Sequence, residues 1–178
     1  MDVDEGGKGR SRILILDDEI RVVKAVSRVF AVSREIKVES STSPDEALRL
    51  VEKTPDLRLV ISDYLMPGMD GLEFLTRVSQ LRPEIIRIVL TGHANLETTL
   101  RAINEVGVYK FILKPWNNHD LYWTVVRALE LEEVRRENRT LKERLKLQAK
   151  LVKQIEDLYP GISRIERDRD GAIVLDEV

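Results

Sequence analysis

The segment LRLVISDYLMPGMDG, residues 57–71, is an apolar run that ends on an acidic residue and continues into a turn. Its first five residues are apolar except for Arg58, so the run has the composition of a strand in a protein core. Asp63 ends the run, and a Met-Pro-Gly turn begins three residues later. The rest of the chain must explain why a carboxylate ends a strand of this kind.

Short apolar runs alternate with helical patterns on both sides of this segment, from Ile13 to about Ala128. The predicted strands are ILIL (13–16), IKVES (36–40), LRLVIS (57–62), IIRIVLT (85–91) and YKFIL (109–113). Strands that alternate with helices predict an α/β fold, in which a parallel sheet is built through right-handed crossovers and carries helices on both faces.

Several of the predicted helices begin with recognisable caps. Ser43 has the position of an N-cap, with a proline next to it and Glu46 at the spacing of a capping box. Asp70 and Glu73 repeat that spacing. Asn95 is expected to cap a further helix that continues to about residue 105.

Polar residues end or directly follow four of the five predicted strands: Asp17 and Asp18, Asp63, Thr91, and Lys114. In open parallel sheets, ligands bind at the carboxyl ends of the strands, so we expect these side chains to converge at one edge. Taken singly, an Asp at a strand end is usually a cap or turn residue, and a Lys-Pro pair is only a loop. Their joint placement predicts a site.

Crowded carboxylates repel one another unless a cation holds them, and a hard divalent ion, most naturally Mg²⁺, is the expected partner. Lys114 and Thr91 supply an ammonium and a hydroxyl suited to phosphoryl oxygens. A carboxylate can itself be the nucleophile in phosphoryl transfer. Asp63 fits that role best, because it ends the strand expected at the centre of the sheet.

Four segments, in this order and spacing, resemble the receiver domain of two-component response regulators: ILILDDE (13–19), VISDYLMPGMDG (60–71), VLTGHA (89–94) and FILKPW (111–116). The resemblance covers about residues 11–130 and implies a flavodoxin-like (βα)5 fold with a five-stranded parallel sheet. It implies that Asp63 accepts a phosphoryl group from the phosphohistidine of a sensor histidine kinase.

The resemblance also assigns the other site residues. Asp18 matches a direct metal ligand, Asp17 the acid that orients metal-bound waters, and the backbone carbonyl of Leu65 a further Mg²⁺ ligand. Thr91 and Lys114 match the residues that bind the phosphoryl group.

The same resemblance implies a switch, in which Thr91 moves toward the phosphoryl group and an aromatic residue three positions before the lysine turns inward. That residue is Phe111, which has no hydroxyl, so a switch here would depend on packing; a fixed core role for Phe111 is the alternative. Leu65 and His93 occupy positions that tune phosphoryl lifetime in the family. The resemblance implies slow self-dephosphorylation. No glycine-rich nucleotide loop, histidine pair of a metal hydrolase or helix-turn-helix pattern follows the receiver, so we expect no output enzyme on this chain.

Bulk composition excludes several classes of protein. The chain has 178 residues, 43% hydrophobic and 34% charged, with a net charge of -2 at pH 7, which argues against broad binding to nucleic acid or anionic membranes. It has no cysteine, no apolar run of membrane-spanning length and no signal-peptide core, so we expect a cytoplasmic protein. Residues 1–10 are interpreted as a disordered lead-in.

A helix is predicted from Asn117 or Asn118 to Tyr159 without a proline or glycine, which is longer than a receiver requires. Over residues 131–159 it fits a coiled coil. The heptad seam consists of Leu131, Val134, Asn138, Leu141, Leu145, Gln148, Val152 and Ile155. Self-association as a homodimer is the expected consequence. A second stripe with Leu147, Leu151 and Leu158 leaves the register open, and a helix folded back on its own receiver is the alternative.

Residues 160–178 are interpreted as a tail with a hairpin around the RDG triplet. Output through the coil or tail to an unidentified downstream protein is favoured. A regulatory part of a longer regulator, with an enzymatic or DNA-binding output domain, remains open. An acid-nucleophile phosphatase is disfavoured because Leu65 occupies the position of its second acid. Residues 131–158 hold 8 basic and 6 acidic side chains, interspersed, which argues against a DNA-binding helix.

Overall fold

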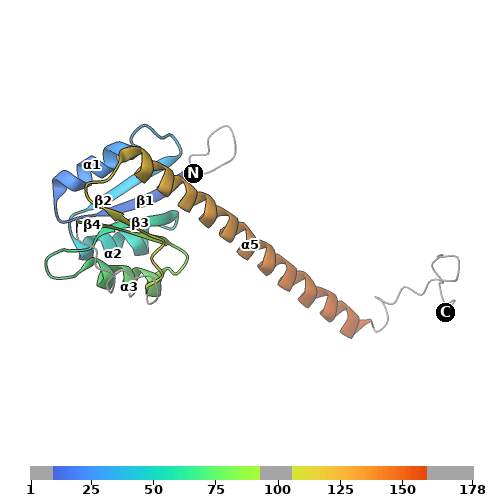
Figure 1. Cartoon of the computed structure of the whole chain (residues 1–178). Helices are drawn as coiled ribbons and strands as arrows, with labels where there is room; N and C mark the ends of the chain where they lie inside the picture. Colours follow the sequence, from blue (N-terminus) through green and yellow to red (C-terminus); the bar gives the residue numbers. More distant parts are fainter. Residues whose placement is uncertain (1–9, 93–105, 160–178) are drawn as a thin grey trace, which may run out of the picture. The chain divides into compact units, whose positions relative to one another are not determined.

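The computed structural model describes residues 10–92 and 106–159. The chain divides into two compact units, Met1–Glu133 and Val134–Val178, which are considered separately. Element labels follow Figure 1 and contain no α4. The elements are β1 (Ser11–Leu16), α1 (Ile20–Phe30), β2 (Ile36–Ser41), α2 (Pro44–Lys53), β3 (Leu57–Asp63), α3 (Gly71–Leu81), β4 (Ile86–Thr91), β5 (Lys110–Leu113) and α5 (Asn118–Leu158).

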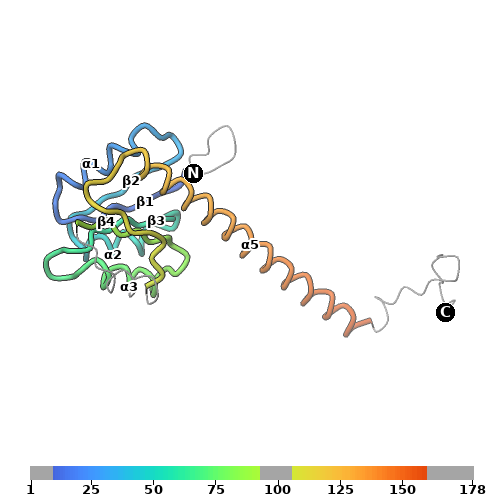
Figure 2. Tube along the Cα trace, viewed as in Figure 1, coloured from blue at the N-terminus to red at the C-terminus, as the bar shows by residue number. Residues whose placement is uncertain are grey.

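The first unit is built on a five-stranded sheet in the order β2-β1-β3-β4-β5. All four strand pairs are parallel. Figure 2 traces the chain from β1 to β4 through the helices α1, α2 and α3 that connect these strands. The predicted α/β fold is therefore confirmed, and β3, which ends in Asp63, is the central strand.

Helices cover both faces of the sheet (Figure 1). One core lies between the sheet and helices α2 and α3, and includes Phe74 and Leu75. The other lies between the sheet and α1 with the beginning of α5, and includes Phe30 and Leu121. Ile13 to Leu16 are at most 1% exposed, because their strand is covered on both faces as the apolar run predicted.

Two of the predicted helix caps have different outcomes. Asp70 caps α3, since its Oδ1 accepts a hydrogen bond from the Glu73 amide at 2.8 Å. Ser43 is the N-cap residue of α2 and Pro44 its first residue, as predicted, but the capping box with Glu46 is wrong, because Ser43 makes no side-chain capping bond. Glu46 and the Ser43 amide instead share Ser41, the last residue of β2, as their partner: its hydroxyl donates to Glu46 at 2.6 Å and accepts from the Ser43 amide at 3.0 Å.

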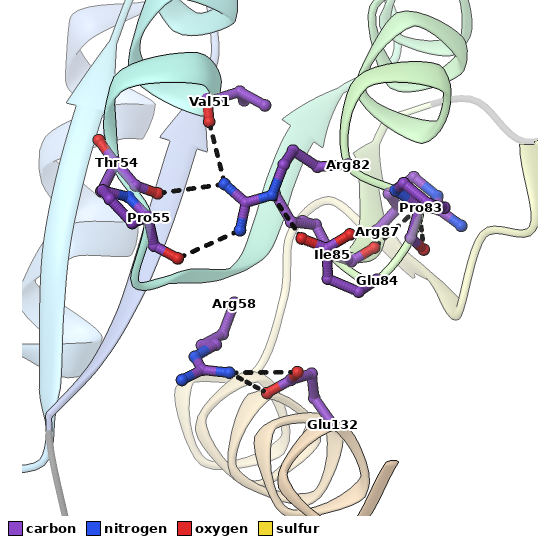
Figure 3. Close-up of polar contacts among 10 residues, drawn as sticks. All are labelled: Val51, Thr54, Pro55, Arg58, Arg82, Pro83, Glu84, Ile85, Arg87 and Glu132. Atoms are coloured by element: carbon purple, nitrogen blue, oxygen red, sulfur yellow. Dashed lines mark hydrogen bonds and ion pairs between the residues drawn. The ribbon is translucent and has the colours of Figure 1, made fainter. Parts of the chain in front are cut away.

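Arginine side chains make hydrogen bonds and ion pairs near the amino ends of the strands (Figure 3). Arg82, which follows α3, donates to the carbonyl groups of Thr54 and Pro55 beyond the end of α2, at 3.4 and 3.2 Å. Arg58 on β3 points toward Glu132 on α5 and donates to both of its carboxylate oxygens, at 3.1 and 3.3 Å. Glu132 is only 2% exposed, so this pair is a buried contact of the first unit.

Helix α5 begins where the sequence predicted. The Asn117 Oδ1 accepts hydrogen bonds from the amides of His119 and Asp120, which caps the helix. The first turns bury an apolar face against the sheet. In the second unit the apolar side chains of α5 are exposed, with values of 45–74%. Within the described ranges, no helix has both the length and the apolar character needed to cross a membrane.

Some predicted features lie outside the described residues. These are the lead-in up to residue 9, the helix expected from Asn95 to residue 105, His93, and the hairpin expected in residues 160–178.

Candidate functional site

The polar residues predicted to converge do so at the carboxyl edge of the sheet. Asp17 and Asp18 follow β1, Asp63 ends β3, Thr91 ends β4, and Lys114 follows β5. Strands β1, β3 and β4 are neighbours, and the Lys114 amide donates to the Thr91 carbonyl at 2.8 Å, which extends the pairing of β4 and β5 to the site.

The three acids form a tight group. One carboxylate oxygen from each of Asp17, Asp18 and Asp63 lies within 4.8 Å of the others. Asp17 is 1% exposed and Asp63 is 8% exposed, whereas Asp18 is open to solvent. The group therefore has two buried members and one member that a solvated ion can reach.

Lys114 connects the two buried acids. Its Nζ lies 2.7 Å from the Asp17 Oδ2 and 2.9 Å from the Asp63 Oδ1. The other oxygen of Asp17, Oδ1, accepts a hydrogen bond from the Glu19 amide at 2.9 Å. Both oxygens of Asp17 thus have protein donors, which fixes the orientation of this carboxylate.

Burial and pairing act in opposite directions on the ionisation of the site. Burial raises the pKa of Asp17, and the neighbouring carboxylate of Asp63 adds to the rise, although Lys114 and the Glu19 amide oppose it. Burial lowers the pKa of Lys114, but its bonds to Asp17 and Asp63 outweigh this and leave the pKa raised. The ammonium therefore stays charged at neutral pH, as a binder of anionic groups must.

The donor set fits a hard divalent cation. Three carboxylates and one ammonium leave an excess of negative charge, and every ligand is oxygen, as Mg²⁺ prefers. Mg²⁺ usually keeps several of its waters, so three acids at this spacing do not all have to contact it directly.

The backbone of Asp63 is held by two contacts that the sequence reasoning missed. The Ser62 hydroxyl donates to the Asp63 carbonyl at 2.9 Å. Gly71, the first residue of α3, packs directly on that carbonyl, and its amide donates to the Tyr64 carbonyl at 2.8 Å. The sequence does contain a signal for this contact. Gly71 begins a predicted helix, where no left-handed conformation is needed, and a glycine at such a position indicates that another part of the backbone lies close to it.

The remaining predicted site residues have differing surroundings. Thr91 is 1% exposed. Phe111 is half-buried and packs against the core next to α2 and α3. Leu65 follows Asp63 by two residues, and its side chain is 57% exposed. The turn after it contains Gly68 with a φ of 83°, a conformation that favours glycine.

Comparison with known proteins agrees with this geometry. The family model of the response regulator receiver domain matches residues 13–126. The hydrogenase transcriptional regulatory protein HoxA of Cupriavidus necator is 37% identical over 123 residues, which are 69% of this chain and 25% of that protein. The nitrogen assimilation regulatory protein NtrX of Azorhizobium caulinodans is 34% identical over 134 residues, 74% of this chain and 29% of that protein.

Solved structures give the same result. A CheY-like receiver domain protein from Methanospirillum hungatei superimposes with a TM-score of 0.66 at 28% identity, over 71% of this chain and 99% of that one. NtrX from Brucella abortus gives 0.67 at 30% identity, over 74% of this chain and 30% of that one.

The chain thus spans about a quarter to a third of the length of the curated relatives it matches. Its sheet order, its acidic edge and the family match agree with one another and confirm the resemblance seen in the sequence. The chain belongs to the response regulator receiver family and carries the receiver domain of a two-component signalling protein.

Proposed function

We propose that Asp63 accepts a phosphoryl group from the phosphohistidine of a sensor histidine kinase, in a reaction that depends on Mg²⁺. The observation that carries this proposal is the position of the Asp63 carboxylate, 2.9 Å from the Lys114 ammonium and in reach of two further acids. A nucleophilic carboxylate with a cation at one oxygen and further acids that can hold a metal beside it is the arrangement that phosphoryl transfer requires.

The metal would be held by the carboxylates of Asp17, Asp18 and Asp63 and by the backbone carbonyl of Leu65. When bound, Mg²⁺ supplies positive charge that neutralises phosphoryl oxygens. Asp17 has the more indirect role, since both of its oxygens already accept protein hydrogen bonds and suit the orientation of metal-bound waters.

In the transfer step, the free oxygen of the Asp63 carboxylate attacks phosphorus. The phosphorus–nitrogen bond of the donor breaks, the electron pair leaves with the imidazole, and an acyl phosphate forms on Asp63. Lys114, which already contacts Asp63, neutralises charge on the transferred group, and the hydroxyl of Thr91 donates to it.

Thr91 and Phe111 are proposed as the switch that reports phosphorylation. Phe111 is half-buried against a core, so its movement would exchange packing contacts rather than break a hydrogen bond. Leu65 and His93 are proposed to tune the lifetime of the acyl phosphate by shaping access for water. The exposed apolar side chain of Leu65 supports this role.

For the whole chain, we propose a cytoplasmic regulator with a receiver over residues 11–130, a coil over 131–159 and a tail over 160–178. Its own chemistry is limited to accepting the phosphoryl group and slowly hydrolysing it. The signal passes through self-association of α5 and an unidentified downstream protein. The exposed apolar side chains of α5 in the second unit support self-association.

The test is the intact mass of the protein after incubation with Mg²⁺ and acetyl phosphate, beside the variant Asp63→Asn. We expect one added phosphoryl group on the wild type, none on the variant, and none on the wild type in excess EDTA. The variant keeps the size of the side chain, so its circular dichroism should be unchanged. A folded wild type that gains no mass with Mg²⁺ present would refute the proposal.

A second candidate is the same receiver acting as the regulatory part of a longer regulator. The length of the matched relatives favours it, because the aligned region is a small part of each. Sequencing the gene beyond the codon for Val178 decides between the two, since an in-frame output domain would identify the longer form.

A further inference from the structure

The second unit contains a helical face with exposed apolar side chains. In the part of α5 from Val134 to Leu158, the exposed fractions are 55% for Leu141, 63% for Leu145 and 54% for Val152. A helix that exposes large apolar side chains at this frequency is normally covered by a partner.

The charges on this helix select one seam over the alternative. The heptad seam through Val134, Asn138, Leu141, Leu145, Gln148, Val152 and Ile155 contains no charged residue. The alternative seam uses Leu151 and Leu158, but the same row places Glu137 and Arg144 in the interface. Burying those charges is costly, so the uncharged seam is the one that a partner helix covers.

Charge complementarity then points to a second copy in parallel orientation. In a parallel two-stranded coil, each g position lies beside the e position five residues later on the other helix. Glu137 of one copy therefore lies beside Lys142 of the other, and the symmetry of the dimer makes this contact twice. The next such positions bring Arg144 beside Ala149 and Leu151 beside Glu156, so no like charges meet.

The antiparallel alignment that overlaps the whole seam is disfavoured by the same charges. There, e positions face e positions and g positions face g positions, which brings Lys142 against its own copy and Arg144 against its own copy. Polar residues of the seam meet in both alignments, since Asn138 pairs with its own copy in the parallel one and with Gln148 in the antiparallel one. These layers therefore do not decide the orientation, and the flanking charges decide it.

We propose that Val134–Leu158 binds the same segment of a second copy as a parallel, in-register coiled coil, with Glu137 of each copy beside Lys142 of the other. This inference rests on the self-association proposed above and adds its orientation and its specificity-determining residues. A parallel coil brings two receivers to the same end of one dimer.

The absence of cysteine in the chain makes orientation directly measurable. Val152→Cys in the full chain places one thiol in the seam, and mild oxidation should convert most of the protein to a disulfide-linked dimer. In the antiparallel alignment the two thiols would be about 27 Å apart along the axis, far beyond the reach of a disulfide. Lys150→Cys, on the outer face of the coil, is the matched control and should stay unlinked.

A charge exchange tests the residues. Glu137→Lys alone sets like charges side by side twice in each dimer and should raise the dissociation constant of the dimer about tenfold at low salt. Lys142→Glu alone should do the same. The double variant restores opposite charges in the parallel register only, so recovery to near the wild-type value supports the proposal and failure to recover overturns it.

The outcomes separate the proposals from one another. A wild-type dimer without a Val152→Cys disulfide would overturn the parallel orientation and leave self-association intact. A wild type that is monomeric in sedimentation would overturn both. Phosphorylation of Asp63, measured by mass in the same samples, is independent of either result.

Discussion

Gly71 and Asp63 are in direct backbone contact. A β-carbon built on Gly71 would lie 1.9 Å from the carbonyl oxygen of Asp63 and 2.9 Å from its carbonyl carbon. The beginning of α3 therefore packs on the end of β3 at the residue proposed as the phospho-acceptor. This contact fixes the peptide that carries the Asp63 side chain, and only a glycine permits it.

Gly71→Ala should destabilise the receiver and displace Asp63. Real β-carbons do not approach a carbonyl oxygen this closely, so the helix must move, at a cost of about 1–3 kcal/mol in the free energy of unfolding. We expect slower phosphorylation by acetyl phosphate as well. Gly92→Ala is the control, because no described residue beyond its chain neighbours lies within 4 Å of a β-carbon built on it, and urea unfolding should show a change below about 0.5 kcal/mol.

The sequence was sufficient to predict the gathering of Asp17, Asp63, Thr91 and Lys114. Strand periodicity and the rule of parallel crossovers determine which residues share an edge, without any knowledge of side-chain contacts. The central position of β3 followed in the same way and is confirmed.

Contacts between elements were not predictable by pattern. The pairing of Glu46 with Ser41 rather than with Ser43 depends on where β2 ends, and the two serines have the same chemistry. Glu132 has the heptad position of a solvated residue, yet it is buried beside Arg58, because the receiver still covers α5 at that point. Such choices depend on packing that a one-dimensional pattern does not contain.

In the metal-free receiver, the contribution of Asp17 to the free energy of unfolding should fall as the pH rises from acidic to neutral. Because burial raises the pKa of Asp17 in the fold, the native state binds more protons than the unfolded chain between the ordinary and the raised pKa. This contribution is present below that window and is lost as pH rises through it. In EDTA, the free energy of unfolding of the wild type minus that of Asp17→Asn should therefore decrease with pH. An increase would contradict the raised pKa.

Magnesium should stabilise the folded receiver through the acidic group. At a concentration one hundred times its dissociation constant, a ligand that binds only the native state adds about 2.7 kcal/mol. We expect thermal unfolding to show a gain of this size for the wild type and a much smaller one for Asp18→Asn, which removes the solvent-exposed ligand. Glu52→Gln, an exposed change near the end of α2, should keep the full gain. Equal gains in wild type and Asp18→Asn would argue against metal binding at this site.

Arg58→Ala should destabilise the receiver without affecting its chemistry. The substitution removes the ion pair to Glu132, whose carboxylate stays 98% buried, and breaking a buried pair typically costs about 3–5 kcal/mol. Arg58 is partly exposed, so solvent screening reduces the expected loss to about 2–3 kcal/mol in urea unfolding.

The exposed pair of Arg77 and Glu73 provides the matched control for this prediction. Both of its side chains are about half exposed, so Arg77→Ala should cost less than about 1 kcal/mol. Arg58 is the second residue of β3 and Asp63 its last, so the two lie at opposite ends of the strand. Phosphorylation of Arg58→Ala, measured where the variant is folded, should therefore match the wild type. Equal destabilisation by the two arginine substitutions would mean that the buried contact with Glu132 contributes no more than a surface pair.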